Sequence, residues 1–270
     1  MRFDPQTLSA LLPEVMEVAR AAGREIMAVY AQDFAVTYKG DRSPLTEADI
    51  ASQRIITAGL ARIAPGIPLL GEESASADIA ARRQWPSLWL VDPLDGTREF
   101  VKRNGEFTVN IALVADHQPV LGVLYGPAQQ VLFAAARGSG AFCVDEHGTR
   151  RRLYAAKRAA NPPRVLGSRS HRDTSLDAVL DRLGAHELLR VGSALKFGWL
   201  ADGRGDLYVR LSPTCEWDTA AGQAIAEEAG ARVVDLQGEP LRYNQRETLI
   251  NPSFAAWADD SVDWLRLVKS

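Results

Sequence analysis

Residues 89–107 read WLVDPLDGTREFVKRNGEF, and they decide how the rest of the chain is interpreted. The apolar start of this stretch predicts a short strand that ends at Asp92. Pro93 biases Asp92 toward extended backbone, whereas Gly96 tolerates a positive φ and a close approach of the main chain to a ligand. Carboxylates such as Asp92 and Asp95 suit Mg²⁺, and free amides at a turn suit phosphate oxygens. The turn therefore predicts a metal and phosphate site, although Asp, Pro and Gly also build ordinary turns.

The composition bounds the class of protein. A chain of 270 residues with 46% hydrophobic residues can bury a large core without dividing into independent domains. Thirty-one basic and 34 acidic residues give a net charge of −3, which excludes a basic field that recruits nucleic acid. Cys143 and Cys215 lie in no CxxC motif and near no histidine cluster, so we expect reduced thiols and no zinc site.

The sequence contains no targeting or membrane-spanning pattern. Its N-terminus lacks the basic start and apolar core of a secretory signal, and no run of about 18 uninterrupted apolar residues occurs. We therefore expect a soluble, cytoplasmic protein.

The first half, residues 1–150, has the pattern of an α+β unit. Apolar residues at helical spacing across 8–29 predict an opening amphipathic helix, and Thr46 with Asp49 resembles a capping box that starts a second helix. Turn signals separate three β-rich runs, which predicts an antiparallel meander. These runs are 107–114, 119–124 and 131–136.

The second half, residues 151–270, alternates short strand and helix patterns. Such alternation predicts an α/β sheet with ligands at the strand ends. The strand candidates are 164–166, 188–191, 206–211 and 231–234, and the helix candidates are 176–183, 193–201 and 217–228. We expect the two halves to form one compact unit, an αβαβα sandwich in which the N-terminal part carries the metal-binding turn and the C-terminal part completes the site.

Two further acidic segments accompany the turn, one at 71–74 (GEES) and one at 216–222 (EWDTAAG). Each has an ordinary structural alternative: Glu72 can be a solvated loop residue, and Asp49 and Asp218 can cap helix N-termini. Three small residues follow Asp218 and permit another backbone to pack closely against that helix.

Taken together, three signatures resemble the inositol monophosphatase superfamily of metal-dependent, lithium-sensitive phosphatases. They occur in that family's order and with similar spacing, and the resemblance covers nearly the full chain. It implies the layered αβαβα fold of the inositol monophosphatase and sugar phosphatase type. The signatures are GEE at 71–73, DPLDGT at 92–97 and WDTAAG at 217–222.

Within that superfamily, other segments are similar to the bacterial 3′(2′),5′-bisphosphate nucleotidases of CysQ type rather than to inositol phosphatases. They are REFVKRNGEFTVNIALV at 98–114, GSRSH at 167–171, GSALKFG at 192–198 and SPTCEWDTAAG at 212–222. This closer resemblance implies a phosphoric monoester hydrolase for a nucleotide bisphosphate.

The resemblance implies a set of metal ligands: Glu72, Asp92, Asp95 and Asp218 through their carboxylates, and Leu94 through its backbone carbonyl. Four converging carboxylates repel one another and raise their pKa values unless cations neutralise them. Two or three Mg²⁺ ions, with one pair about 3.5 to 4 Å apart, would supply that charge, polarise the phosphoryl oxygens and activate water.

By the same resemblance, Asp49 and Thr97 orient and deprotonate the attacking water, and Glu72 is counted with them as a catalytic residue. The amides of Gly96 and Thr97 hold the scissile phosphate during in-line attack. No covalent phosphoenzyme is required.

Substrate contacts are implied for Ser168, His171, Gly192, Lys196 and Asp218. Lys196 falls in the first turn of the helix expected after 193, where a cation and free amides can meet a second phosphate. Without the resemblance, Lys196 is interpreted as an exposed surface lysine and His171 as a loop residue.

The expected reaction is Mg²⁺-dependent hydrolysis of 3′-phosphoadenosine 5′-phosphate to AMP and phosphate, which in the family recycles a by-product of sulfate assimilation. The alternatives are an inositol monophosphatase, against which KRNGEF at 102–107 argues, and a catalytically silent nucleotide sensor. Peripheral association with the cytoplasmic face of the inner membrane is left open by the resemblance, but no lipidation motif or strongly basic amphipathic helix predicts it. The sequence does not distinguish a monomer from a homodimer.

Overall fold

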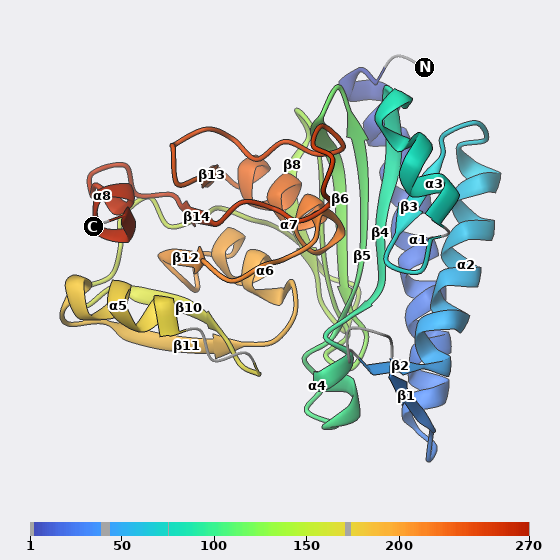
Figure 1. Cartoon of the computed structure of the whole chain (residues 1–270), viewed down its shortest axis with the longest axis horizontal. Coiled ribbons are helices and arrows are strands. Elements are labelled where there is room, and N and C mark those ends of the chain that lie inside the picture. The colour runs from blue at the N-terminus through green and yellow to red at the C-terminus, as the bar shows by residue number, and fades with distance from the viewer. Residues whose placement is uncertain (1–2, 39–43, 75, 171–173, 270) are drawn as a thin grey trace.

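The chain folds into five layers in the order helices, sheet, helices, sheet, helices (Figure 1). The computed structural model describes residues 3–38, 44–74, 76–170 and 174–269. The helical layers are formed by α1 (Pro5–Tyr30) with α2 (Glu47–Ile63), by α6 (Leu195–Ala201) with α7 (Glu216–Glu228), and by α5 (Thr174–Leu183) with α8 (Trp264–Lys269). The αβαβα sandwich expected from the sequence is confirmed.

The outer helices α1 and α2 begin where local side chains satisfy their first backbone amides. Asp4 accepts a hydrogen bond from the amide of Thr7 at 2.8 Å, and α1 then continues through Pro13. Thr46 and Asp49 form the predicted capping box at the start of α2. The helices bury apolar residues against the same face of the large sheet, which fixes the position of Asp49 near the end of a strand.

The large sheet has seven strands in the order β3-β4-β5-β6-β7-β8-β9. All neighbours pair antiparallel except β3 and β4, so the meander predicted for this region is confirmed. Every residue of β5 is buried, because helices cover both faces of the sheet. The strands are β3 (Leu69–Gly71), β4 (Ser87–Asp95), β5 (Thr108–Ala115), β6 (Gln118–Gly126), β7 (Val131–Ala136), β8 (Gly140–Val144) and β9 (Arg150–Arg152).

The small sheet has five strands in the order β11-β10-β12-β14-β13. Its first three are parallel, as the alternating pattern predicts, whereas β14 pairs antiparallel with both β12 and β13. The sequence analysis did not identify β14. The strands are β10 (Arg164–Ser168), β11 (Glu187–Val191), β12 (Leu207–Arg210), β13 (Arg232–Asp235) and β14 (Phe254–Trp257).

Five short elements complete the described fold. A small antiparallel pair, β1 (Val36–Tyr38) and β2 (Pro44–Thr46), precedes α2. The helix α3 (Ser76–Ala81) and a 3₁₀ turn (Arg82–Gln84) lead into β4, and α4 (Thr97–Val101) follows it directly. The metal-binding turn predicted from the sequence therefore lies at the junction of β4 and α4.

The middle helical layer joins the two sheets through one hydrophobic cluster, which includes Leu90 of β4, Ile225 of α7 and Phe254 of β14. A Cβ added to Gly122 of β6 would lie 2.4 Å from the carbonyl oxygen of Ala221, so the two backbones are in direct contact. The close packing expected for the small residues after Asp218 is thereby confirmed. This contact holds the first turns of α7 against the large sheet.

None of the described helices is long and apolar enough to cross a lipid bilayer.

Candidate active site

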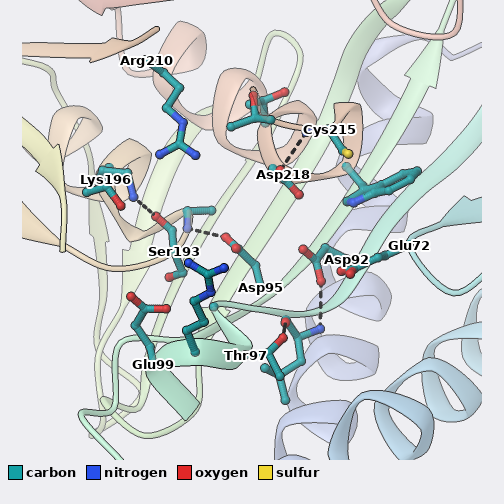
Figure 2. A pocket seen from close by; sticks show the side chains of 18 of the residues that line it. Glu72, Asp92, Asp95, Thr97, Glu99, Ser193, Lys196, Arg210, Cys215 and Asp218 are labelled. Carbon is teal, nitrogen blue, oxygen red and sulfur yellow. Dashed lines mark hydrogen bonds between the residues drawn. The ribbon is translucent and has the colours of Figure 1, made fainter. Parts of the chain in front are cut away.

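A cleft of about 440 Å³ lies where the end of β4 meets the middle helical layer (Figure 2). Most of the side chains predicted for the site line it, although they come from segments far apart in the sequence. These are Glu72, Asp92, Leu94, Asp95, Gly96, Thr97, Ser168, Lys196 and Asp218. Asp49 contacts Thr97 of its wall, Gly192 directly precedes Ser193 of its wall, and His171 lies outside the described residues.

The turn at the end of β4 departs from regular pairing between Asp92 and Asp95, where the register with β5 shifts. The hydroxyl of Ser52 on α2 donates to the carbonyl oxygen of Pro93 at 2.6 Å, and the amide of Leu94 donates to Asp92 Oδ1 at 3.0 Å. Gly96 follows with φ of 88°, a left-handed conformation that a side chain rarely adopts. The local geometry thus turns both carboxylates toward one cleft.

Electrostatics in the cleft disfavour ionised carboxylates. Burial, with the nearby charges of Glu72, Asp95 and Asp218, raises the pKa of Asp92 well above its usual range. Burial followed by the charge of Asp95 raises the pKa of Asp218 to about 8, and burial also raises the pKa of Asp95. Such a cluster favours binding of a compensating cation.

The carboxylates are oriented by backbone N–H groups. The amide of Ala194 donates to Asp95 Oδ2 at 2.6 Å, and the amide of Cys215 donates to Asp218 Oδ2 at 2.8 Å. Oxygen ligands held in this way suit Mg²⁺, and groups that orient a ligand are part of most metal sites. Across the described ranges, no group of three or more His, Cys, Asp or Glu side chains has the arrangement needed to hold a metal ion. The donor set fits the ion chemically, and the ligand assignment stays a prediction.

Asp49 and Thr97 meet at the edge of the carboxylate cluster. Thr97 Oγ1 lies 3.5 Å from Asp49 Oδ1 and 3.3 Å from the carbonyl oxygen of Leu94. Asp49 is only 2% exposed and caps α2 through Thr46, and burial is the main cause of its raised pKa. A buried carboxylate beside a hydroxyl is an arrangement that can orient a water molecule and accept its proton.

Lys196 is not the exposed lysine that its sequence context alone would allow. It is 4% exposed, and its Nζ donates to the carbonyl oxygens of Ser193 at 2.5 Å and Val191 at 3.2 Å. Burial lowers its pKa to about 8. The ammonium group therefore holds the turn before α6 as well as contributing positive charge to the cleft.

Arg210 is a cleft residue that the sequence analysis missed. It ends β12 and points into the cleft near Lys196, on the side opposite Glu72 and Asp92 (Figure 2). Its Nη2 is 3.4 Å from the carbonyl oxygen of Pro213, while its buried Nε has no hydrogen-bond partner within the described part of the chain. A charged residue at the carboxyl end of a strand in an α/β sheet was the signal that could have identified it.

The cleft thus has an acidic wall with four carboxylates and a second wall with Lys196 and Arg210, called the basic wall here, on which Glu99 also lies (Figure 2). Such a pairing suits a substrate that carries two phosphates, one close to bound cations and one close to Lys196 and Arg210.

Comparison with known proteins identifies the family of the chain. The model of the inositol monophosphatase family matches residues 7–262. A curated 3′(2′),5′-bisphosphate nucleotidase CysQ from Escherichia coli K12 is 47% identical over 246 residues, covering 90% of this chain and 98% of the relative. The CysQ of Aggregatibacter actinomycetemcomitans is 36% identical over 267 residues, covering 98% and 99%.

Solved structures show the same fold. The chain is similar to CysQ from Bacteroides thetaiotaomicron, described as a bacterial member of the inositol monophosphatase family, with a TM-score of 0.81, 39% identity, and coverage of 94% of this chain and 99% of that one. It is also similar to the extragenic suppressor protein SuhB from Bartonella henselae, with a TM-score of 0.79, 27% identity, and coverage of 97% and 99%.

Proposed function

The chain belongs to the inositol monophosphatase family, and from that premise we propose that it is a 3′(2′),5′-bisphosphate nucleotidase. It hydrolyses 3′-phosphoadenosine 5′-phosphate to AMP and phosphate and serves sulfur assimilation, and this assignment is supported by relatives named 3′(2′),5′-bisphosphate nucleotidase CysQ. The observation that carries the proposal is the cleft in which four carboxylates face Lys196 and Arg210. A substrate with one phosphate needs only one of these walls.

The family depends on Mg²⁺, and Glu72, Asp92, Asp95, Asp218 and the carbonyl of Leu94 are the residues proposed to hold two or three ions. Bound Mg²⁺ supplies charge neutralisation, a Lewis acid for the phosphoryl oxygens and stabilisation of the leaving oxygen. The proposal is supported by the raised pKa values of three of these carboxylates, because the cluster is poorly compensated by the protein alone.

Asp49 and Thr97 prepare the attacking water. The Thr97 hydroxyl accepts a hydrogen bond from this water or donates one to it, and Asp49 receives the proton directly or through Thr97. The amides of Gly96 and Thr97, at the start of α4, bind oxygens of the scissile phosphate. The transferred group passes to water in one step, with in-line geometry.

The second phosphate is bound on the basic wall. Arg210 presents a guanidinium, whose planar fork suits a phosphate, and Lys196 adds positive charge on the same wall. Ser168, at the end of β10, lines the same cleft and is proposed to contact the nucleotide. Gly192 and His171 keep their predicted role as substrate contacts, although the amide of Gly192 donates to Glu106.

Replacing Arg210 by Met is expected to raise KM for the nucleotide bisphosphate about 10- to 100-fold, because a charge-assisted hydrogen bond is lost. With adenosine 3′-monophosphate, which lacks the second phosphate, KM should change little. Steady-state kinetics with both substrates make the comparison. Arg204→Met is the matched control, since Arg204 stacks on Trp199. Equal losses on the two substrates would show that Arg210 does not bind the second phosphate.

Phosphate release separates the proposed function from its nearest alternative. The protein is incubated with 3′-phosphoadenosine 5′-phosphate or inositol 1-phosphate, each with Mg²⁺, with Mg²⁺ plus Li⁺, and with EDTA. We expect lithium-sensitive turnover of the nucleotide that EDTA abolishes. A preference for inositol phosphate would keep the metal site and reject the nucleotide assignment. Nucleotide binding without turnover of either substrate would favour the silent sensor.

A cytoplasmic location, a monomeric or homodimeric state and any peripheral membrane association stay predictions from the sequence. They do not enter the mechanism.

A further inference from the structure

The sequence analysis singled out the segments KRNGEF (102–107) and GSRSH (167–171), and residues 169 and 170 of the second segment form hydrogen bonds with the first. Lys102 Nζ donates to Ser170 Oγ at 3.1 Å. Arg169 donates twice to the carboxylate of Glu106, from Nε at 2.5 Å and from Nη2 at 2.6 Å. The loop after α4 is thereby tied to the end of β10, across the boundary between the two sheets.

The Glu106 carboxylate accepts a third hydrogen bond, from the backbone of the turn at 192–194. The amide of Gly192 donates to Glu106 Oε2 at 2.7 Å. A Cβ at Gly192 would lie 2.7 Å from the carbonyl oxygen of Glu106 and 2.8 Å from its Cβ, so only a glycine permits this approach. At the other end of the turn, the amide of Ala194 donates to Asp95. Two carboxylates from the N-terminal half therefore hold both ends of the turn.

The turn between these ends is under strain. Ser193 has φ of 48°, a left-handed conformation that costs a non-glycine residue about 1 to 3 kcal/mol and persists only where surrounding contacts enforce it. Ser193, Ala194 and Lys196 all line the cleft. The positions of Ser193 and Lys196 relative to Asp95 thus depend on what holds Gly192.

We propose that Glu106 is a positioning residue, which fixes the turn at 192–194 and so sets the distance between Lys196 and the proposed metal ligands. This inference rests on the proposed function for its kinetic consequence, whereas its structural consequence is independent of the substrate. It also assigns KRNGEF and GSRSH a role in the preference for a nucleotide bisphosphate.

A contribution to global stability alone does not account for this arrangement. The side chains of Glu106 and Arg169 are 14% and 43% exposed, and ion pairs at such positions stabilise a fold by about 1 kcal/mol or less. The backbone contact at Gly192 lies beside Ser193 and Ala194, which line the cleft, so its loss displaces groups that bind the substrate.

Three variants test the proposal. Glu106→Ala removes all three hydrogen bonds, and Glu106→Gln keeps an acceptor for the amide of Gly192. Glu228→Ala is the matched control, because Glu228 likewise accepts hydrogen bonds from two backbone amides, those of Gly138 and Gly140, near the β7–β8 turn. All three are measured for kinetics, melting temperature and hydrogen–deuterium exchange of peptides that cover 190–198.

Glu106→Ala should raise KM for the nucleotide bisphosphate by about tenfold or more, with a change in kcat of less than about threefold. Glu106→Gln should recover most of the loss. Amide exchange across 190–198 should accelerate in Glu106→Ala and stay as in wild type in Glu228→Ala. Unchanged exchange in Glu106→Ala would overturn the proposal.

An effect on KM that merely follows melting temperature in all variants would also overturn it. If wild type fails to hydrolyse the bisphosphate, the proposed function fails, and the exchange measurement still decides the role of Glu106.

Discussion

Replacing Asp95 by Asn lowers kcat by more than about 100-fold, because residues that merely orient a metal ligand already contribute about 10- to 100-fold. The amide oxygen of Asn can still accept the hydrogen bond from Ala194, so the turn at 192–194 keeps its anchor. The loss of kcat therefore results from the missing negative charge and metal ligand rather than from collapse of the cleft. Turnover over a range of Mg²⁺ concentrations and calorimetric titration with Mg²⁺ measure it.

The same substitution should leave the metal-free protein as stable as wild type or more stable. Burial raises the pKa of Asp95 and of its neighbours, so removing one negative charge relieves repulsion in the absence of cations. Melting temperatures in EDTA check this. Asp206→Asn is the control: Asp206 pairs with Arg164 at 2.7 Å, and its loss should destabilise the fold without changing Mg²⁺ dependence. An Asp95→Asn protein with most of its activity would refute the ligand assignment.

Replacing Asp49 by Asn should lower kcat about 10²- to 10⁴-fold, the range for loss of a general base. The side-chain oxygen of Asn can still accept the hydrogen bond from the amide of Thr46, so α2 should keep its capping box. KM for the nucleotide and affinity for Mg²⁺ should change little, since the substitution removes a proton acceptor and leaves the four proposed carboxylate ligands in place. Stopped assays of phosphate release with saturating Mg²⁺ and substrate give kcat.

Asp4→Asn provides a matched control for Asp49→Asn, because Asp4 caps α1 and is exposed. It should retain full activity. A parallel loss of activity in both variants would indicate that helix capping, rather than proton transfer, accounts for the effect at Asp49.

The sequence alone predicts a structural feature when that feature depends on residues that are neighbours in the chain. The turn around Gly96 and the capping box of Thr46 and Asp49 are local, and both are present in the structure. The apolar runs of the large sheet were equally clear, because helices cover both of its faces. Local sequence signals located these carboxylates in their elements, and the family resemblance predicted that they share one site.

The sequence alone does not predict the position of a residue or strand when that position depends on contacts between segments far apart in the chain. The short FAAW of β14 has no alternation of apolar and polar residues, and its strand forms only between β12 and β13. Arg210 is an unremarkable arginine until β12 is placed, and Glu106 gains its partners from segments 63 and 86 residues away. These contacts exist only in the folded molecule.

The backbone contact between Gly122 of β6 and Ala221 of α7 has a consequence for how the protein folds. Asp218 lies near Asp92 and Asp95 only when α7 is docked on the large sheet, so the carboxylate cluster exists only in the assembled fold. A cation that binds this cluster binds the fully folded chain and not a folded half. By mass action it stabilises the whole molecule by about 2.7 kcal/mol at a concentration 100 times its Kd. Magnesium in the cell would then protect both sheets from unfolding at once.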